Sequence, residues 1–112
     1  MLGDPPGRSL LTLVAVTAVG EEVLFRGLLP ALVRSVGFSS VGARRIAVLA
    51  FGVWHLPDAA PDGPLTAIGT FMLTSAAAAV VFEPLRRRTG SVFAPAAAHL
   101  LLNGCGLLLT EW

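Results

Sequence analysis

The sequence predicts an all-α fold, a membrane-embedded bundle of about four helices, and three observations lead to it. First, the hydrophobic fraction of the 112 residues is 54% and the charged fraction is 13%, whereas a soluble domain carries about 25% charged residues. Second, the mean hydropathy is +0.77, although a short soluble chain needs polar residues to cover its large surface. Third, four apolar stretches of helical length are separated by short segments that contain Pro, Gly, Arg or Asp. The same values exclude a disordered chain.

The first expected helix follows a polar, helix-breaking tail of residues 1–8. It spans residues 9–35, with Ser9 as its N-cap and a bend before Pro30. An alternative reading of the first 20 residues is a secretory signal peptide with a cleavage site at 17–20. The apolar pattern continues beyond that point, which favours a helix of the mature chain.

Three further helices are expected. The second starts after Gly42 and ends at about Leu56, where Pro57 stops it, and a turn-rich loop covers 57–64. The third contains residues 65–82, which are 18 residues without a charge, about the length that crosses a hydrocarbon core. After a basic loop at 86–90, the fourth spans 91–109.

The arginines predict a topology. The loops after the first and third helices hold six of them, which are Arg34, Arg44, Arg45, Arg86, Arg87 and Arg88. The loop between the second and third helices holds two Asp and no base. The positive-inside rule therefore places both basic loops in the cytoplasm and both termini outside. Because these arginines flank spanning segments, a nucleic-acid surface is disfavoured, and no nucleic-acid partner is expected.

Six polar residues fall inside the predicted spans, where a charge costs about 2.5 to 3.5 kcal/mol and is a functional candidate by default. They are Glu21, Glu22, Arg26, His55, His99 and Asn103. Counted from the nearest basic loop at about 1.5 Å per residue, Glu21, His55 and His99 lie at depths of about 20, 15 and 16 Å. Three helices thus bring polar groups to one level, near the middle of the membrane.

Helical spacing indicates how these side chains face. Glu22 pairs with Arg26 at i, i+4, which leaves Glu21 free to point into the bundle. His99 and Asn103, also i, i+4, project together. A carboxylate, two imidazoles and a carboxamide in a partly dry site can activate a water and stabilise an oxyanion. The alternative is that they only hold helices together through hydrogen bonds.

Three segments resemble the motifs of a known family. Residues 21–26 match EExxxR, residues 51–55 match FxxxH, and residues 99–103 match HxxxN. In this order and spacing they are similar to the signatures of the CPBP family, which comprises type II CAAX prenyl endopeptidases, bacterial Abi proteins and bacteriocin-processing enzymes. Residues 9–112 therefore look like a CPBP-like membrane domain.

The resemblance implies an intramembrane endopeptidase of a bacterial cytoplasmic membrane that acts on a peptide or protein substrate. By motif, the catalytic residues are Glu21, which activates the water, its partner His55, and the oxyanion-binding His99 and Asn103. Glu22 and Arg26 are supporting residues. A non-proteolytic scaffold or immunity protein is the alternative function.

No cofactor is expected, although the family has often been labelled a metalloprotease. HExxH is absent, so a zinc ion would need ligands drawn from Glu21, Glu22, His55 and His99. Asn103 suits an oxyanion donor better than a ligand. With Glu22 occupied by Arg26, no carboxylate is expected to orient either imidazole, as a zinc site requires.

Three features stand apart from this interpretation. Family members usually carry membrane helices ahead of EExxxR, and this chain has none before residue 9; a fragment, a mis-assigned start and a minimal domain all remain open. Cys105 lies about 120° from His99 around the helix, so we expect it to be a buried small hydrophobe rather than a nucleophile. The pair Glu83–Pro84 at the membrane edge has no explanation from sequence.

Overall fold

The structure is a computed structural model that describes residues 6–110, and within them it is all helical, as predicted. The first long helix consists of α1 (Pro6–Glu22), the π-helical turn η1 (Val23–Leu28) and α2 (Leu29–Ser35). The second is α3 (Ser40–Trp54). The third consists of α5 (Pro64–Ala77), the π-helical turn η3 (Ala78–Phe82) and α6 (Glu83–Thr89), and the fourth is α7 (Phe93–Thr110).

Four expected boundaries are wrong. The first helix begins at Pro6 rather than Ser9, because proline is tolerated in the first turn of a helix, and the rest of the expected tail lies outside the described residues. The second begins at Ser40, capped by the Ser39 hydroxyl, which accepts a hydrogen bond from the Gly42 N–H at 3.0 Å. The first long helix shows no break at residues 17–20, where the signal-peptide alternative places a cleavage site.

The two other wrong boundaries concern segments expected to be loops. Residues 57–64 are mostly helical, in α4 (Leu56–Ala59) and the 3₁₀ turn η2 (Ala60–Asp62), because Pro57 and Pro61 occupy first-turn positions that need no N–H. The arginines at 86–88 form the last turn of α6, where cations are favoured by the helix dipole. Gly90 then ends that helix with a φ of 67°.

A π-helical turn precedes a proline in each of the two broken helices. Pro30 has no N–H, so it cannot bond the carbonyl four residues earlier, which belongs to Arg26. The Arg86 Nε donates to that carbonyl instead, at 3.3 Å, and so ties α6 to the first helix. The bend expected before Pro30 therefore takes the form of a π-helical turn.

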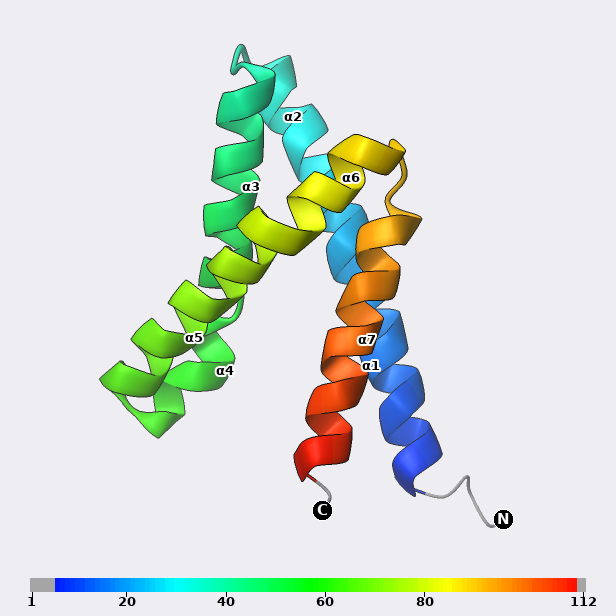
Figure 1. The fold of residues 1–112 in the computed structure, drawn as a ribbon. Coiled ribbons are helices and arrows are strands. Elements are labelled where there is room, and N and C mark those ends of the chain that lie inside the picture. The colour runs from blue at the N-terminus through cyan, green and yellow to red at the C-terminus, as the bar shows by residue number, and fades with distance from the viewer. Residues whose placement is uncertain (1–5, 111–112) are drawn as a thin grey trace.

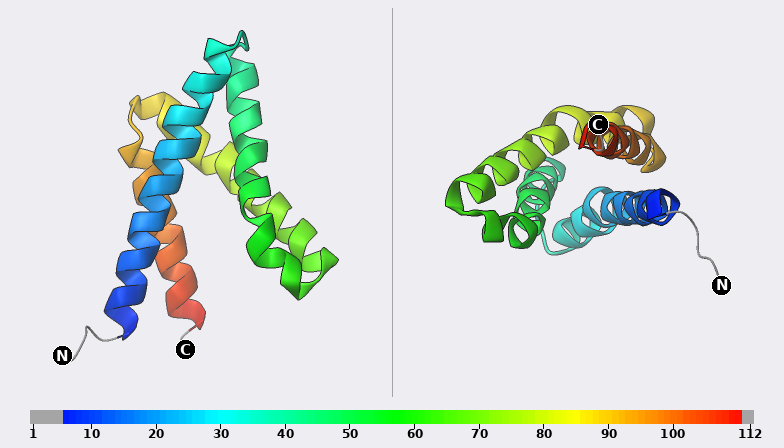
Figure 2. Two further views of the ribbon diagram at one scale, coloured as in Figure 1. Left: turned by 180° about the vertical axis from the view of Figure 1, so that it is seen from behind. Right: turned by 90° about the horizontal axis from the view of Figure 1, so that it is seen from below.

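The long helices pack as two pairs (Figure 1). One pair is α1 with α7, and the other is α3 with α5; α3 also packs against α2. The segment from α5 to α6 crosses from one pair to the other, which the view from behind also shows (Figure 2). A small core of Phe25, Phe51, Ala78 and Phe82 lies where the pairs meet.

Candidate active site

The predicted site residues come from three separate helices and meet beside the aromatic core. Glu21 and Glu22 are the last residues of α1, directly before η1. His55 forms the turn after α3, and His99 lies in α7, where it stacks on Phe82 with ring centroids 5.0 Å apart. The core thus surrounds the polar groups with apolar side chains, and low polarity strengthens their mutual electrostatic interactions.

His99 is oriented by Glu22. Its Nδ1 lies 2.9 Å from Oε1 of Glu22, whose side chain is fully buried. Because an ionised carboxylate only accepts, the Nδ1–H of His99 donates this bond. The other ring nitrogen, Nε2, then faces Oε2 of Glu21 at 3.7 Å.

His55 is oriented by the end of its own helix. The His55 N–H bonds the carbonyl of Gly52, so the carbonyl of Phe51 is left for the imidazole, and Nδ1 donates to it at 2.7 Å. In the neutral imidazole the lone pair is then on Nε2, which lies 3.7 Å from Oε2 of Glu21. The four-residue spacing of FxxxH allows the bond between the His55 imidazole and the Phe51 carbonyl.

Arg26 anchors the other side of Glu22, as the i, i+4 spacing predicts. Its Nε lies 3.3 Å from Oε2 of Glu22, and both side chains are fully buried. The guanidinium carbon also lies 4.8 Å from the centroid of the Phe51 ring, a cation–π contact.

Glu83 is a member of this network that sequence reasoning missed. Its Oε1 lies 3.7 Å from the Nε of Arg26, and only 5% of the residue is exposed. The signal was the acid itself, at the end of a long uncharged stretch and next to a proline. Its i, i+4 neighbour in the sequence is Arg87, so nothing in the sequence showed that its partner, Arg26, would come from another helix.

A cavity of about 400 Å³ adjoins the imidazoles. It is lined by His55, His99 and Asn103, together with apolar side chains that include Leu73 and Leu102. Glu21 is not among the lining residues and joins the site through the two imidazoles; its side chain is 13% exposed. The structure thus brings Glu21 to both histidines, and both histidines and Asn103 to one cavity.

Two expectations about this site are wrong. Glu22 does not bind Arg26 alone, since its Oε2 pairs with Arg26 while its Oε1 accepts from His99. A carboxylate is therefore available to orient an imidazole. Cys105 is exposed rather than buried, because a position about 120° from His99 around α7 need not face a neighbouring helix. Within the described residues, no group of three or more His, Cys, Asp or Glu side chains is arranged to hold a metal ion.

Comparison with known proteins places this arrangement in a family. No curated protein matches the chain, and no solved structure matches it. The model of one family, described as type II CAAX prenyl endopeptidase Rce1-like, matches residues 6–105, which include all three motifs. The family is one of membrane-integral CAAX-type proteases. As the motifs predicted, the chain belongs to the Rce1-like family of type II CAAX prenyl endopeptidases.

Proposed function

We propose that this chain is an intramembrane endopeptidase of a bacterial cytoplasmic membrane in which Glu21 activates the attacking water. One observation carries the proposal: the Nε2 atoms of His55 and His99 both lie 3.7 Å from the same oxygen of Glu21. In a protein that needed polar groups only to bond helices together, Glu22 and Arg26 would be sufficient. The convergence of two fixed imidazoles on a second carboxylate is typical of a site built for proton transfer.

In the proposed mechanism, each group has one task. A water held by Nε2 of His55 gives a proton to Glu21, and its oxygen attacks the carbonyl carbon of the scissile peptide bond. Asn103 and the doubly protonated form of His99 donate hydrogen bonds to the oxyanion. Glu21 then passes its proton to the amide nitrogen as the oxyanion collapses and the C–N bond breaks, which releases a carboxylic acid and an amine.

The rest of the network positions these groups. Glu22 fixes the His99 ring through Nδ1, and Arg26 holds the second oxygen of Glu22. The cavity beside the imidazoles has apolar and polar walls, which suits an extended peptide segment inside a membrane. From the family and the cavity we infer the substrate class, a peptide or protein that enters the membrane to the depth of the site.

Zinc hydrolysis is the rival mechanism, because Glu21, His55 and His99 are residues of types that bind zinc, although the described residues hold no group arranged to bind a metal ion. Glu22 and the Phe51 carbonyl satisfy the need for groups that orient the imidazoles. However, a zinc ion on Glu21 would occupy the one carboxylate that, among the described residues, lies within 4.0 Å of both imidazoles, and would leave the water without that base. We therefore propose that no metal is required.

The test compares membranes that contain the chain, its Glu21→Gln variant or an Asp58→Asn control, an exposed acid outside the network. Peptides released from membrane proteins are identified by mass spectrometry. We expect cleavage products with the parent chain and the control, and a fall of about 100-fold or more with Glu21→Gln, because the base is lost. Products that persist with Glu21→Gln would favour the non-proteolytic scaffold.

The metal question is settled with the same assay. We expect the products to form equally in excess EDTA. Loss of activity with EDTA, followed by recovery when zinc is added back, would restore the metalloprotease mechanism.

A further inference from the structure

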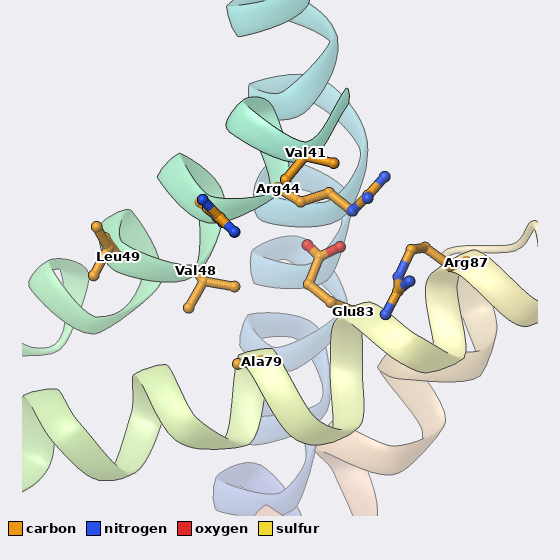
Figure 3. Close-up of a pocket in the computed structure, with 8 residues that line it drawn as sticks. Val41, Arg44, Val48, Leu49, Ala79, Glu83 and Arg87 are labelled. Atoms are coloured by element: carbon orange, nitrogen blue, oxygen red, sulfur yellow. The ribbon is translucent and has the colours of Figure 1, made fainter. Parts of the chain in front are cut away.

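A second cavity of about 400 Å³ lies between α3 and the η3–α6 segment, and its residues differ entirely from those of the first (Figure 3). Its apolar wall is formed by Val41, Val48, Leu49 and Ala79. Its charged lining consists of Arg44, Arg45, Arg87 and the acid Glu83. The cavity is therefore amphipathic.

The sequence builds this cavity from two helix faces. Ala79, Glu83 and Arg87 follow one another at intervals of four residues, so they lie on one face of the third long helix. Val41, Arg45 and Leu49 repeat at the same interval along α3. Figure 3 shows Arg44 and Arg87 extending toward Glu83 from these two helices.

Within the part of the chain that the structure describes, the arginines that line the cavity form no ion pair. Among the described residues, every ion pair within 4.0 Å that contains an arginine is made by Arg26. Glu83 offers the cavity one negative charge, and it already lies 3.7 Å from Arg26. The lining thus contains three guanidiniums and one carboxylate, which leaves an excess of positive charge suited to an anion. Guanidinium groups bind phosphate oxygens through two parallel hydrogen bonds.

The position of the cavity favours a lipid over a free anion. Arg87 belongs to the last turn of the segment Pro64–Thr89, which is long and apolar enough to cross a membrane. The end of such a segment lies at the level of lipid headgroups. The apolar wall opens outward, since Val41 is 47% exposed and Leu49 is 54% exposed, and it offers a path for an acyl chain.

We propose that this cavity binds an anionic phospholipid, with its phosphate on Arg44, Arg45 and Arg87 and the start of its acyl chains along the apolar wall. Basic pockets between membrane helices on the cytoplasmic side suit such headgroups. The bound lipid would tie α3 to α6 and compensate the repulsion among the three arginines.

The test measures the thermal stability of the purified chain in detergent while short-chain phosphatidylglycerol is added. We expect a saturable rise in the unfolding temperature, with little rise for phosphatidylcholine of the same chains or for inorganic phosphate. In the double variant Arg44→Gln/Arg87→Gln, the apparent affinity for phosphatidylglycerol should fall at least about tenfold.

The matched control is Arg34→Gln/Arg88→Gln, which removes the same charge from two exposed arginines that do not line the cavity. It should keep the affinity of the parent chain. The milder Arg44→Lys/Arg87→Lys variant keeps the charge but loses the paired hydrogen bonds, so its affinity should be intermediate even if the first variant folds poorly.

Three results would overturn the proposal. An equal loss of affinity in the control would show a general charge effect. An equal response to phosphatidylcholine would show that the apolar wall acts alone, and an equal response to inorganic phosphate would show a free-anion site.

Discussion

Glu22 illustrates how much a single buried carboxylate can do. Its two oxygens serve two helices, since Oε2 pairs with Arg26 one turn along its own chain and Oε1 accepts from His99 of α7. Arg26 is shared in turn between Glu22 and Glu83. The imidazole of His99 is thus connected to the third long helix through two salt bridges, and Glu83 acts as a positioning residue.

We predict that Glu83→Gln destabilises the protein by about 1–3 kcal/mol and lowers proteolysis. Removing the carboxylate leaves the buried guanidinium of Arg26 with one acidic partner instead of two, and a buried charge without full compensation is costly. Thermal unfolding in detergent measures the first effect. Asp62→Asn, which removes an exposed carboxylate, is the control. If Glu83→Gln and Asp62→Asn unfold at the same temperature, Glu83 does not hold Arg26.

At the level of residues, sequence predicted contacts within a helix better than contacts between helices. The Glu22–Arg26 pair follows from i, i+4 spacing alone. The bond from His99 to Glu22 and the approach of Glu83 to Arg26 depend on how helices cross, which spacing along one helix does not contain. The same limit explains Cys105, whose exposure depends on which face of α7 meets a neighbour.

At the level of elements, one close approach decides how α3 packs on α5. Gly52 is buried, and a Cβ built on it would collide with Oγ of Ser75 and lie 2.9 Å from Cδ2 of Phe71. Only glycine fits there without a movement of the Ser75 and Phe71 side chains or of α5. Since the FxxxH segment contains Gly52, the same turn of α3 both packs the pair of helices and presents His55.

We therefore predict that Gly52→Ala destabilises the protein by about 1–3 kcal/mol, because overpacking outweighs the better helix propensity of alanine. The matched control is Gly69→Ala in α5, where nothing lies within 4 Å of the added Cβ. That variant should be neutral or slightly more stable. Unfolding temperatures of both variants in one detergent provide the comparison, and equal values would mean that α5 adjusts freely.

Helix type and order could be predicted from the sequence, but helix ends could not. All four long helices were expected, because each follows an apolar stretch of helical length. The errors lie at prolines and charges. Pro57 and Pro61 start short helices instead of ending one, and Arg86 to Arg88 continue a helix instead of leaving it. Prolines and arginines such as these can lie either just inside or just outside the end of a helix. The tertiary structure therefore decides at which residue each helix ends.

At the scale of the whole molecule, the surface is that of a protein surrounded by lipid. Large apolar side chains are exposed on every long helix, for example Leu32, Leu49, Leu73 and Leu101. So many exposed large apolar side chains on one small protein need a partner, and a membrane supplies one. Among the described residues, the segment Pro64–Thr89 has the length and hydropathy of a membrane span. The sequence predicted this property from composition alone, while the crossing of that segment between two helix pairs needed the structure.

The topology gives the last prediction. The turn between α2 and α3 and the end of α6 lie toward one end of the molecule, while η2 and the described ends of α1 and α7 lie toward the other (Figure 1). All six arginines of the basic segments belong to the first end, so we expect it to be cytoplasmic. With Cys105 replaced by serine, Asp62→Cys should react with an impermeant thiol reagent added to intact cells, whereas Arg87→Cys should react only after the cells are opened. Both positions are exposed, so access to the reagent depends on the side of the membrane rather than on burial. Labelling of Arg87→Cys in intact cells, with Asp62→Cys protected, would invert the orientation and place the arginine-lined cavity in the outer leaflet.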